Sequence, residues 1–128
     1  MDDIVLKTLD IGDVALEFET DYVICRVCEG ADLLGEQASR TCAEIEARMA
    51  GDFGVILDEV NAYSMRFEAM LELKNNARIR CMAVVAYRPV TYGTTKMAFY
   101  VIKKPYRIFS NLDDARVWMQ GEMERKID

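Results

Sequence analysis

The sequence contains no histidine, and this absence narrows the chemistry open to the protein. Histidine is the commonest general base and the commonest metal ligand near neutral pH, and the triads of serine and cysteine hydrolases depend on its imidazole. The sequence also lacks the glycine-rich loop that holds phosphates in nucleotide-binding proteins. We therefore expect a protein that is not an enzyme, with no catalytic residues, no cofactor and no metal ion.

Proline and glycine are scarce, and long apolar runs are missing. Two prolines and seven glycines among 128 residues argue against disordered or low-complexity segments, and an apolar content of 52% supplies a core. No apolar run approaches the roughly 18 residues that span a membrane. The first residues, Met1–Asp3, are acidic, whereas a signal peptide begins with basic residues. We expect one domain over residues 1–128, in the cytoplasm, with no membrane span.

Basic residues are outnumbered by acidic ones, and the two kinds are unevenly distributed. The net charge of −6 argues against nucleic acid as a partner. Residues 1–64 have a net charge of −11, whereas residues 65–110 have a net charge of +7. This asymmetry indicates complementary faces in a homodimer, an anion-facing patch, or neighbouring elements that neutralise one another within the fold.

Four cysteines are present, and two of them form a C-x-x-C motif. Cys25 and Cys28 lie in a segment with the composition of a strand, where residues three apart point to opposite faces, so their thiols are not expected to meet on a metal. Cys42 and Cys81 lie on apolar stripes and are expected to be small core residues. All four are predicted to be structural thiols.

A hairpin is predicted near the start of the chain. Ala15–Glu19 alternates apolar and polar residues with the period of a half-buried strand, and Thr20 and Asp21 lead into the β-branched segment Tyr22–Cys28. An earlier strand is predicted at Ile4–Leu6, followed by a turn near Gly12.

After the hairpin, helical and strand patterns alternate. Apolar residues recur every three or four positions from Leu34 to Met49, which predicts a helix of about five turns that Gly51 ends. Phe53–Asp58 is a nearly continuous apolar run, typical of a central strand covered on both faces. The next predicted helix is capped by Ser64 and has Phe67, Met70, Leu71 and Lys74 on one side. It is followed by a strand at Arg78–Tyr87, a helix at Tyr92–Lys103 and an edge strand at Tyr106–Phe109. The final predicted helix begins at the capping box Ser110–Asp113, and its apolar face consists of Leu112, Ala115, Trp118 and Met119.

The predicted fold class is α/β. The element order is β-β-β-α-β-α-β-α-β-α, with four helices packed against a mixed, mostly parallel sheet led by an antiparallel hairpin. Alternation of strands and helices predicts parallel central strands joined by right-handed crossovers.

Two places along the chain are candidate sites. Asp58 and Glu59 end the central strand, where α/β sheets place ligands, and they form an acid–base pair, half of a magnesium site, or a solvated strand end. The entry to the helix at Tyr92–Lys103 has hydroxyls, amides and an arginine that either hold a phosphate or carboxylate or cap the helix. The residues of this second cluster are Arg88, Thr91, Thr94 and Thr95.

The helix at Tyr92–Lys103 is apolar on all sides. This pattern indicates a core helix, a dimer contact or a ligand cleft. The residues that would line such a contact or cleft are Met97, Tyr100 and Val101.

The last part of the chain resembles the ending of bacterial STAS-like proteins. Lys103–Met119 has the sequence KKPYRIFSNLDDARVWM, similar to the family pattern Pro-x-x-x-Phe-x-x-x-(Asp/Glu)-(Asp/Glu)-Ala-x-x-Trp-Leu. Together with the element order, the resemblance extends over nearly the whole chain. It implies the fold of the STAS superfamily, the domain of sulfate transporters and anti-anti-sigma factors, within a poorly characterised bacterial branch named together with Sec14-type domains.

This resemblance also implies a regulatory position. In anti-anti-sigma factors a partner kinase phosphorylates a serine at the start of the helix after the central strand, and the matching residue here is Ser64. Ser64 follows Tyr63 instead of the family's acidic residue, and the loop from Glu59 to Tyr63 is shorter than the family's. Helix capping explains the same serine without regulation, so both roles stay open.

The expected function is therefore that of a non-enzymatic, STAS-like interaction or regulatory module whose partner is another protein or a second copy of the chain. The alternative is a carrier or sensor of a small apolar or amphipathic ligand held beneath Met97–Ile102. A second alternative is an enzyme of unknown class, which the sparse acid–base residues disfavour.

Overall fold

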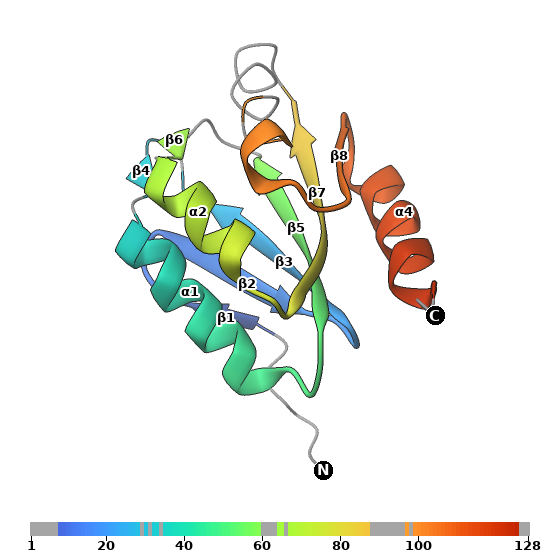
Figure 1. Ribbon diagram of the computed structural model, residues 1–128, viewed down its shortest axis with the longest axis horizontal. Helices are drawn as coiled ribbons and strands as arrows, with labels where there is room; N and C mark the ends of the chain where they lie inside the picture. The colour runs from blue at the N-terminus through green and yellow to red at the C-terminus, as the bar shows by residue number, and fades with distance from the viewer. Residues whose placement is uncertain are drawn as a thin grey trace.

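The computed structural model describes residues 8–28, 30, 32–33, 35–59, 64–65, 67–87, 97 and 99–125. Within these residues, six strands form one mixed sheet in the order β1-β2-β3-β5-β7-β8, with helices on both faces (Figure 1). The strands are β1 (Thr8–Asp10), β2 (Val14–Phe18), β3 (Tyr22–Val27), β5 (Phe53–Glu59), β7 (Ile79–Ala86) and β8 (Tyr106–Phe109). The helices are α1 (Gly35–Arg48), α2 (Phe67–Asn75) and α4 (Leu112–Glu124), and residues 97 and 99–102 are also helical. The predicted α/β class is confirmed.

The antiparallel hairpin leads the sheet as predicted. β2 and β3 pair antiparallel, with Leu16 opposite Cys25. The expected turn follows β1, where Gly12 has a positive φ of 91° that favours glycine and donates its N–H to the Asp10 carboxylate. The strand predicted at Ile4–Leu6 lies outside the described residues, and the first described strand is β1, which pairs with β2.

The other half of the sheet is parallel, which confirms the prediction for the central strands. β3, β5, β7 and β8 follow one another in parallel, with helical segments connecting them (Figure 1). β5 is buried on both sides because its side chains alternate between two apolar clusters: Val55 and Leu57 belong to one, and Ile56 to the other. A continuous apolar run is what such a doubly covered strand requires.

The two faces of the sheet have different covers. One face, which we call the two-helix face, packs against α1, α2 and the helical residue Ile102. The opposite face, the α4 face, packs against α4 through Ala115, Met119 and Met123 (Figure 1). α4 contacts β7, β5 and β8, so it lies over the parallel half of the sheet.

The buried side of α2 differs from the predicted one. The prediction grouped Phe67, Met70, Leu71 and Lys74 on one side of this helix, but only Met70 of the four is buried: Phe67 and Lys74 are exposed and Leu71 is half-buried. The core residues of α2 are Ala69, Met70 and Leu73. The small Ala69 faces α1 and the sheet, and a pattern search that scores large apolar residues overlooks such a contact.

The cap of α4 is also one residue later than predicted. Asn111, not Ser110, is the N-cap residue, and its side-chain oxygen accepts a hydrogen bond of 2.8 Å from the N–H of Asp114. Asparagine and serine are comparable cap residues, and the geometry selects Asn111. The predicted apolar side of the helix is confirmed, since Ala115 and Met119 are fully buried.

Candidate functional site

The candidate site is a network of charged side chains on the α4 face, built around Asp58 at the carboxyl end of β5. Asp58 is 2% exposed and is the one buried charged residue among the residues described. The prediction of a solvated strand end is therefore wrong for this residue. A carboxylate is buried only where partners replace its water, so the neighbours of Asp58 define what this site can do.

Two side chains supply those partners. The Tyr87 hydroxyl, just after β7, donates a hydrogen bond of 3.0 Å to Asp58 Oδ1, and Arg26 Nε on β3 lies 3.4 Å from Asp58 Oδ2. Arg26 is directly opposite Asp58 in the register of β3 and β5. Burial and the neighbouring Asp58 charge raise the pKa of Tyr87 to about 12, so this hydroxyl stays a hydrogen-bond donor.

The network continues across the hairpin to α4. Arg26 also donates to Glu17 Oε1 on β2 at 2.7 Å, and this hydrogen bond lowers the pKa of Glu17. Arg116 on α4 lies 3.6 Å from Glu17 Oε2 and 3.2 Å from Glu19 Oε2, and it donates to the Tyr22 hydroxyl at 3.2 Å. These contacts join the antiparallel half of the sheet to α4.

The chemistry of this arrangement is structural. Asp58 is neutralised by a guanidinium and a hydroxyl, which satisfies a buried carboxylate. The geometry therefore places Asp58 in an ion-pair network. The acid–base pair and the magnesium site considered from the sequence also need Glu59, whose side chain lies outside the described part of the structure, so they stay predictions. Within the described part of the chain, no group of three or more Cys, Asp or Glu side chains could hold a metal ion.

The role of the residues that complete this network was not predicted from the sequence. One signal was available: Arg26 interrupts an otherwise apolar strand, and a strand position of that kind requires a compensating acid. Its partners Glu17 and Asp58 depend on strand register, which the sequence alone did not give.

The predicted regulatory residue Ser64 lies in a short strand. β6 (Ser64–Met65) pairs in parallel with β4 (Asp32–Leu33), and α2 begins afterwards at Phe67. Ser64 is therefore three residues before the helix, and the prediction that it caps α2 is wrong. Both short strands follow the carboxyl ends of β3 and β5 (Figure 1). The regulatory role of Ser64 stays a prediction.

The other predicted cluster falls outside the structure's described residues. Arg88, Thr91, Thr94 and Thr95 all belong to the segment between Tyr87 and Met97, so their predicted anion-binding role stays a prediction.

The three predicted interface residues are described. Met97 and Tyr100 are 64% and 69% exposed, while Val101 is half-buried and packs against the apolar cluster on the two-helix face. The helix is therefore apolar toward solvent on one side and toward the core on the other.

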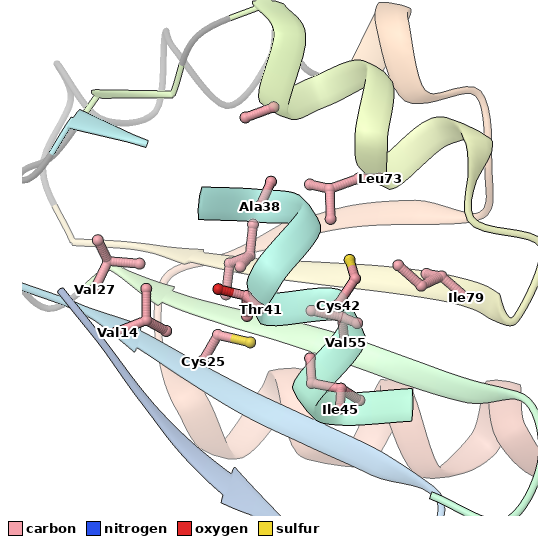
Figure 2. A pocket seen from close by; sticks show the side chains of 12 residues that line it. Val14, Cys25, Val27, Ala38, Thr41, Cys42, Ile45, Val55, Leu73 and Ile79 are labelled. Carbon is pink, nitrogen blue, oxygen red and sulfur yellow. The ribbon is translucent and has the colours of Figure 1, made fainter. Parts of the chain in front are cut away.

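An apolar cavity lies elsewhere, between α1 and the two-helix face (Figure 2). Its volume is about 40 Å³, and Cys42 on α1 and Cys25 on β3 are among the residues that line it (Figure 2). The full lining is Val14, Cys25, Val27, Ala38, Thr41, Cys42, Ile45, Val55, Leu57, Ala69, Leu73 and Ile79. Ligand pockets generally measure roughly 300–1,000 Å³, so this cavity is a packing void of the core.

The four cysteines are free thiols, and three are buried. Burial raises the pKa of Cys25 to about 12, which keeps its thiol neutral. Cys28 lies just beyond β3 and is exposed, so it does not share a site with Cys25. The prediction that the C-x-x-C residues point in different directions is confirmed.

No protein-family model matches the chain, and no curated protein matches it. Among solved structures, the chain is similar to an uncharacterized protein of the DUF3478 family with a SpoIIAA-like fold from Shewanella loihica. The TM-score is 0.58 and the sequence identity 17%, and the match covers 83% of this chain and 91% of that protein.

The chain has a SpoIIAA-like fold. The resemblance first noted in Lys103–Met119 implied a fold of this kind, and the similarity of the two structures confirms the fold. Identity of 17% makes this a statement about the fold alone. Of the helices described, none is long and apolar enough to cross a membrane.

Proposed function

We propose that the protein is a non-enzymatic interaction module that binds a protein partner through the exposed side of the helical residues 97 and 99–102. The observation that supports this function is the exposure of three large apolar side chains, Met97, Phe99 and Tyr100, on one short segment. The SpoIIAA-like fold agrees with an interaction or regulatory module.

The three side chains form a surface that is costly to leave in water. Met97, Phe99 and Tyr100 are 64%, 47% and 69% exposed. The Phe99 ring contacts Tyr100 edge-on, with centroids 5.3 Å apart, and Tyr106 at 5.8 Å. Gathered apolar side chains on a surface mark binding sites, and aromatic residues and methionine are enriched in protein interfaces.

The segment is also anchored firmly to the core, as a binding surface requires. Ile102 is 1% exposed, and the Lys104 ammonium donates to the carbonyls of Asn76 at 2.5 Å and Ile79 at 3.0 Å. Burial lowers the pKa of Lys104, because removing the ammonium charge from water costs free energy. The hydrogen bonds to the two carbonyl groups offset part of that free energy. The partner would therefore bind a surface whose far side is already fixed.

The experiment is co-purification of partners from a native lysate with matched variants. The test variant is Met97→Ser with Tyr100→Ser, and the control is Val117→Ser, which removes an equally exposed apolar side chain from α4 on the other face. We expect the control to recover the same partner as the wild-type chain. The test variant should recover at least about tenfold less of that partner, because it lacks the side chains that anchor the interface. Equal recovery by the test variant and the wild type would overturn the proposal.

A second candidate function, a carrier of a small apolar or amphipathic ligand held beneath Met97–Ile102, has less support, because the apolar cavity described lies under α1 and is far smaller than ligand pockets generally are. The cavity under α1 is apolar, and its volume is about 40 Å³ (Figure 2). Any ligand of ordinary size requires α1 to move away from the sheet. Native mass spectrometry of freshly purified protein tests this function: a bound mass supports it, and a mass of the chain alone counts against it.

A further inference from the structure

Three sulfur atoms meet on the α4 face, away from the surface of Met97, Phe99 and Tyr100. Cys81 on β7 lies with its Sγ 3.5 Å from Met119 Sδ and 3.7 Å from Met123 Sδ. Cys81 and Met119 are 2% and 0% exposed, and Met123 is 7% exposed. The thiol and both thioethers are therefore removed from water and converge on one place.

The backbone arrangement explains why they converge. Met119 and Met123 are four residues apart on α4 and so lie on the same side of the helix. Cys81 belongs to the set of β7 residues that points toward α4. Below them, β5 has Gly54, where an added Cβ would overlap Met119 Sδ and lie 3.3 Å from Cys81 Sγ. Glycine at this position leaves the space that the sulfur atoms occupy.

We propose that Cys81, Met119 and Met123 bind one Cu(I) ion. Thiolate and thioether sulfur are the soft ligands that select Cu(I). A metal–sulfur distance of roughly 2.3 Å, as in thiolate sites, places three trigonal sulfur ligands about 4 Å apart. The two separations from Cys81 Sγ, which are those of hydrogen bonds from the thiol to the thioethers, are 3.5 and 3.7 Å and so about 0.3 to 0.5 Å shorter than that value.

Charge balance favours a monovalent ion at this position. One thiolate and one Cu(I) are neutral together, and the two thioethers add no charge. A divalent ion with the same ligands would leave a net positive charge in an apolar cluster, which is costly without a further anion. The binding step exchanges one proton: the Cys81 thiol releases H⁺ to water, a Cu–S bond replaces the S–H bond, and no atom changes oxidation state.

The end of α4 is the side from which these sulfur atoms are nearest to solvent, since Met123 is the most exposed of the three residues at 7%. Met123 lies in the last turn of α4, which ends at Glu124. Opening of that turn would uncover Met123, because helix ends open most readily. Cys81 and Met119 are 2% and 0% exposed, so Cu(I) reaches them only when α4 loosens further.

The test is anaerobic titration of the full chain with Cu(I) in competition with bathocuproine disulfonate. All variants contain Cys28→Ser, because Cys28 is exposed and would bind copper adventitiously. We expect this background protein to bind one Cu(I) per chain and to release one proton. Met119→Leu with Met123→Leu keeps apolar side chains of similar volume and should lower the affinity by about tenfold or more, and Cys81→Ser should abolish binding.

Two controls separate this site from other sulfur atoms in the core. Met70→Leu with Met82→Leu removes two buried methionines of the two-helix face, and Cys25→Ser with Cys42→Ser removes the thiols that line the cavity. Both control variants should keep the affinity of the background protein. Wild-type affinity in the Met119→Leu/Met123→Leu variant, or no binding by the background protein, would overturn the assignment. Neither result depends on the partner surface of Met97, Phe99 and Tyr100.

Discussion

The two-helix face of the sheet is apolar from β1 to β8, whereas the α4 face is apolar beneath α4 and ionic over β2 and β3. Two helices and residues 101–102 cover the first face. One helix covers the second, and the chain of ion pairs from Asp58 through Arg26 and Glu17 to Arg116 occupies the adjoining part. A single helix is therefore enough to cover this face of the six-stranded sheet, because the side chains beyond the helix are paired charges that tolerate water.

The largest expected effect is on the two-helix face. Ile45 is 2% exposed and lines the cavity under α1, so Ile45→Ala enlarges a void that is already present. We expect the free energy of unfolding to fall by about 3–4 kcal/mol, within the range for buried Ile→Ala. Urea denaturation measures this loss. A loss below about 1 kcal/mol would show that α1 collapses into the cavity.

The next effect tests the ionic part of the α4 face. Arg26→Met leaves the buried Asp58 without its cation, and we expect a loss of about 2–3 kcal/mol, less than for a fully buried pair because the Arg26 side chain is 38% exposed. Adding Asp58→Asn should restore part of the stability, which a double-mutant cycle measures. The matched control is Arg48→Met, which breaks the exposed pair with Glu44 on α1. Equal losses for Arg26→Met and the control would show that the network adds no stability.

A smaller effect is expected at the start of α4. Asn111→Ala removes the hydrogen bond to the N–H of Asp114, and we expect a loss of about 1 kcal/mol. Asn111→Ser keeps a capping oxygen and should cost less. Thermal denaturation distinguishes the two variants, and equal melting temperatures would contradict the assignment of Asn111 as the cap.

The smallest effect concerns pH. The hydrogen bond from Arg26 lowers the pKa of Glu17 from its usual value of 4.5. A depressed folded-state pKa stabilises the fold above the unfolded-state pKa, and that contribution is lost as pH falls through the folded-state value. Glu17→Gln should therefore lower stability at pH 7 by under about 1 kcal/mol, since the pair is partly exposed, and the difference should become smaller as the pH falls below 4.5. Urea denaturation at pH 7 and pH 3 measures the change; a constant difference would contradict it.

The fold was predictable from the sequence because its main signals are local. The apolar run of β5 and the alternation of β2 each depend on one segment, and both predictions were confirmed. The predicted grouping of side chains on α2 was wrong because the small residue Ala69 is part of the core, and a pattern based on large apolar residues overlooks it. The candidate site was not predictable, since Arg26 and Asp58 meet through the pairing of β3 with β5, and Tyr87 reaches Asp58 from the end of a third strand.

The cavity under α1 has a consequence for the response of the protein to hydrostatic pressure. Unfolding eliminates internal voids, so the unfolded chain has the smaller volume, and pressure favours it in proportion to the void removed. The void of about 40 Å³ lies between α1 and the sheet. Compression should therefore first loosen α1 on the two-helix face.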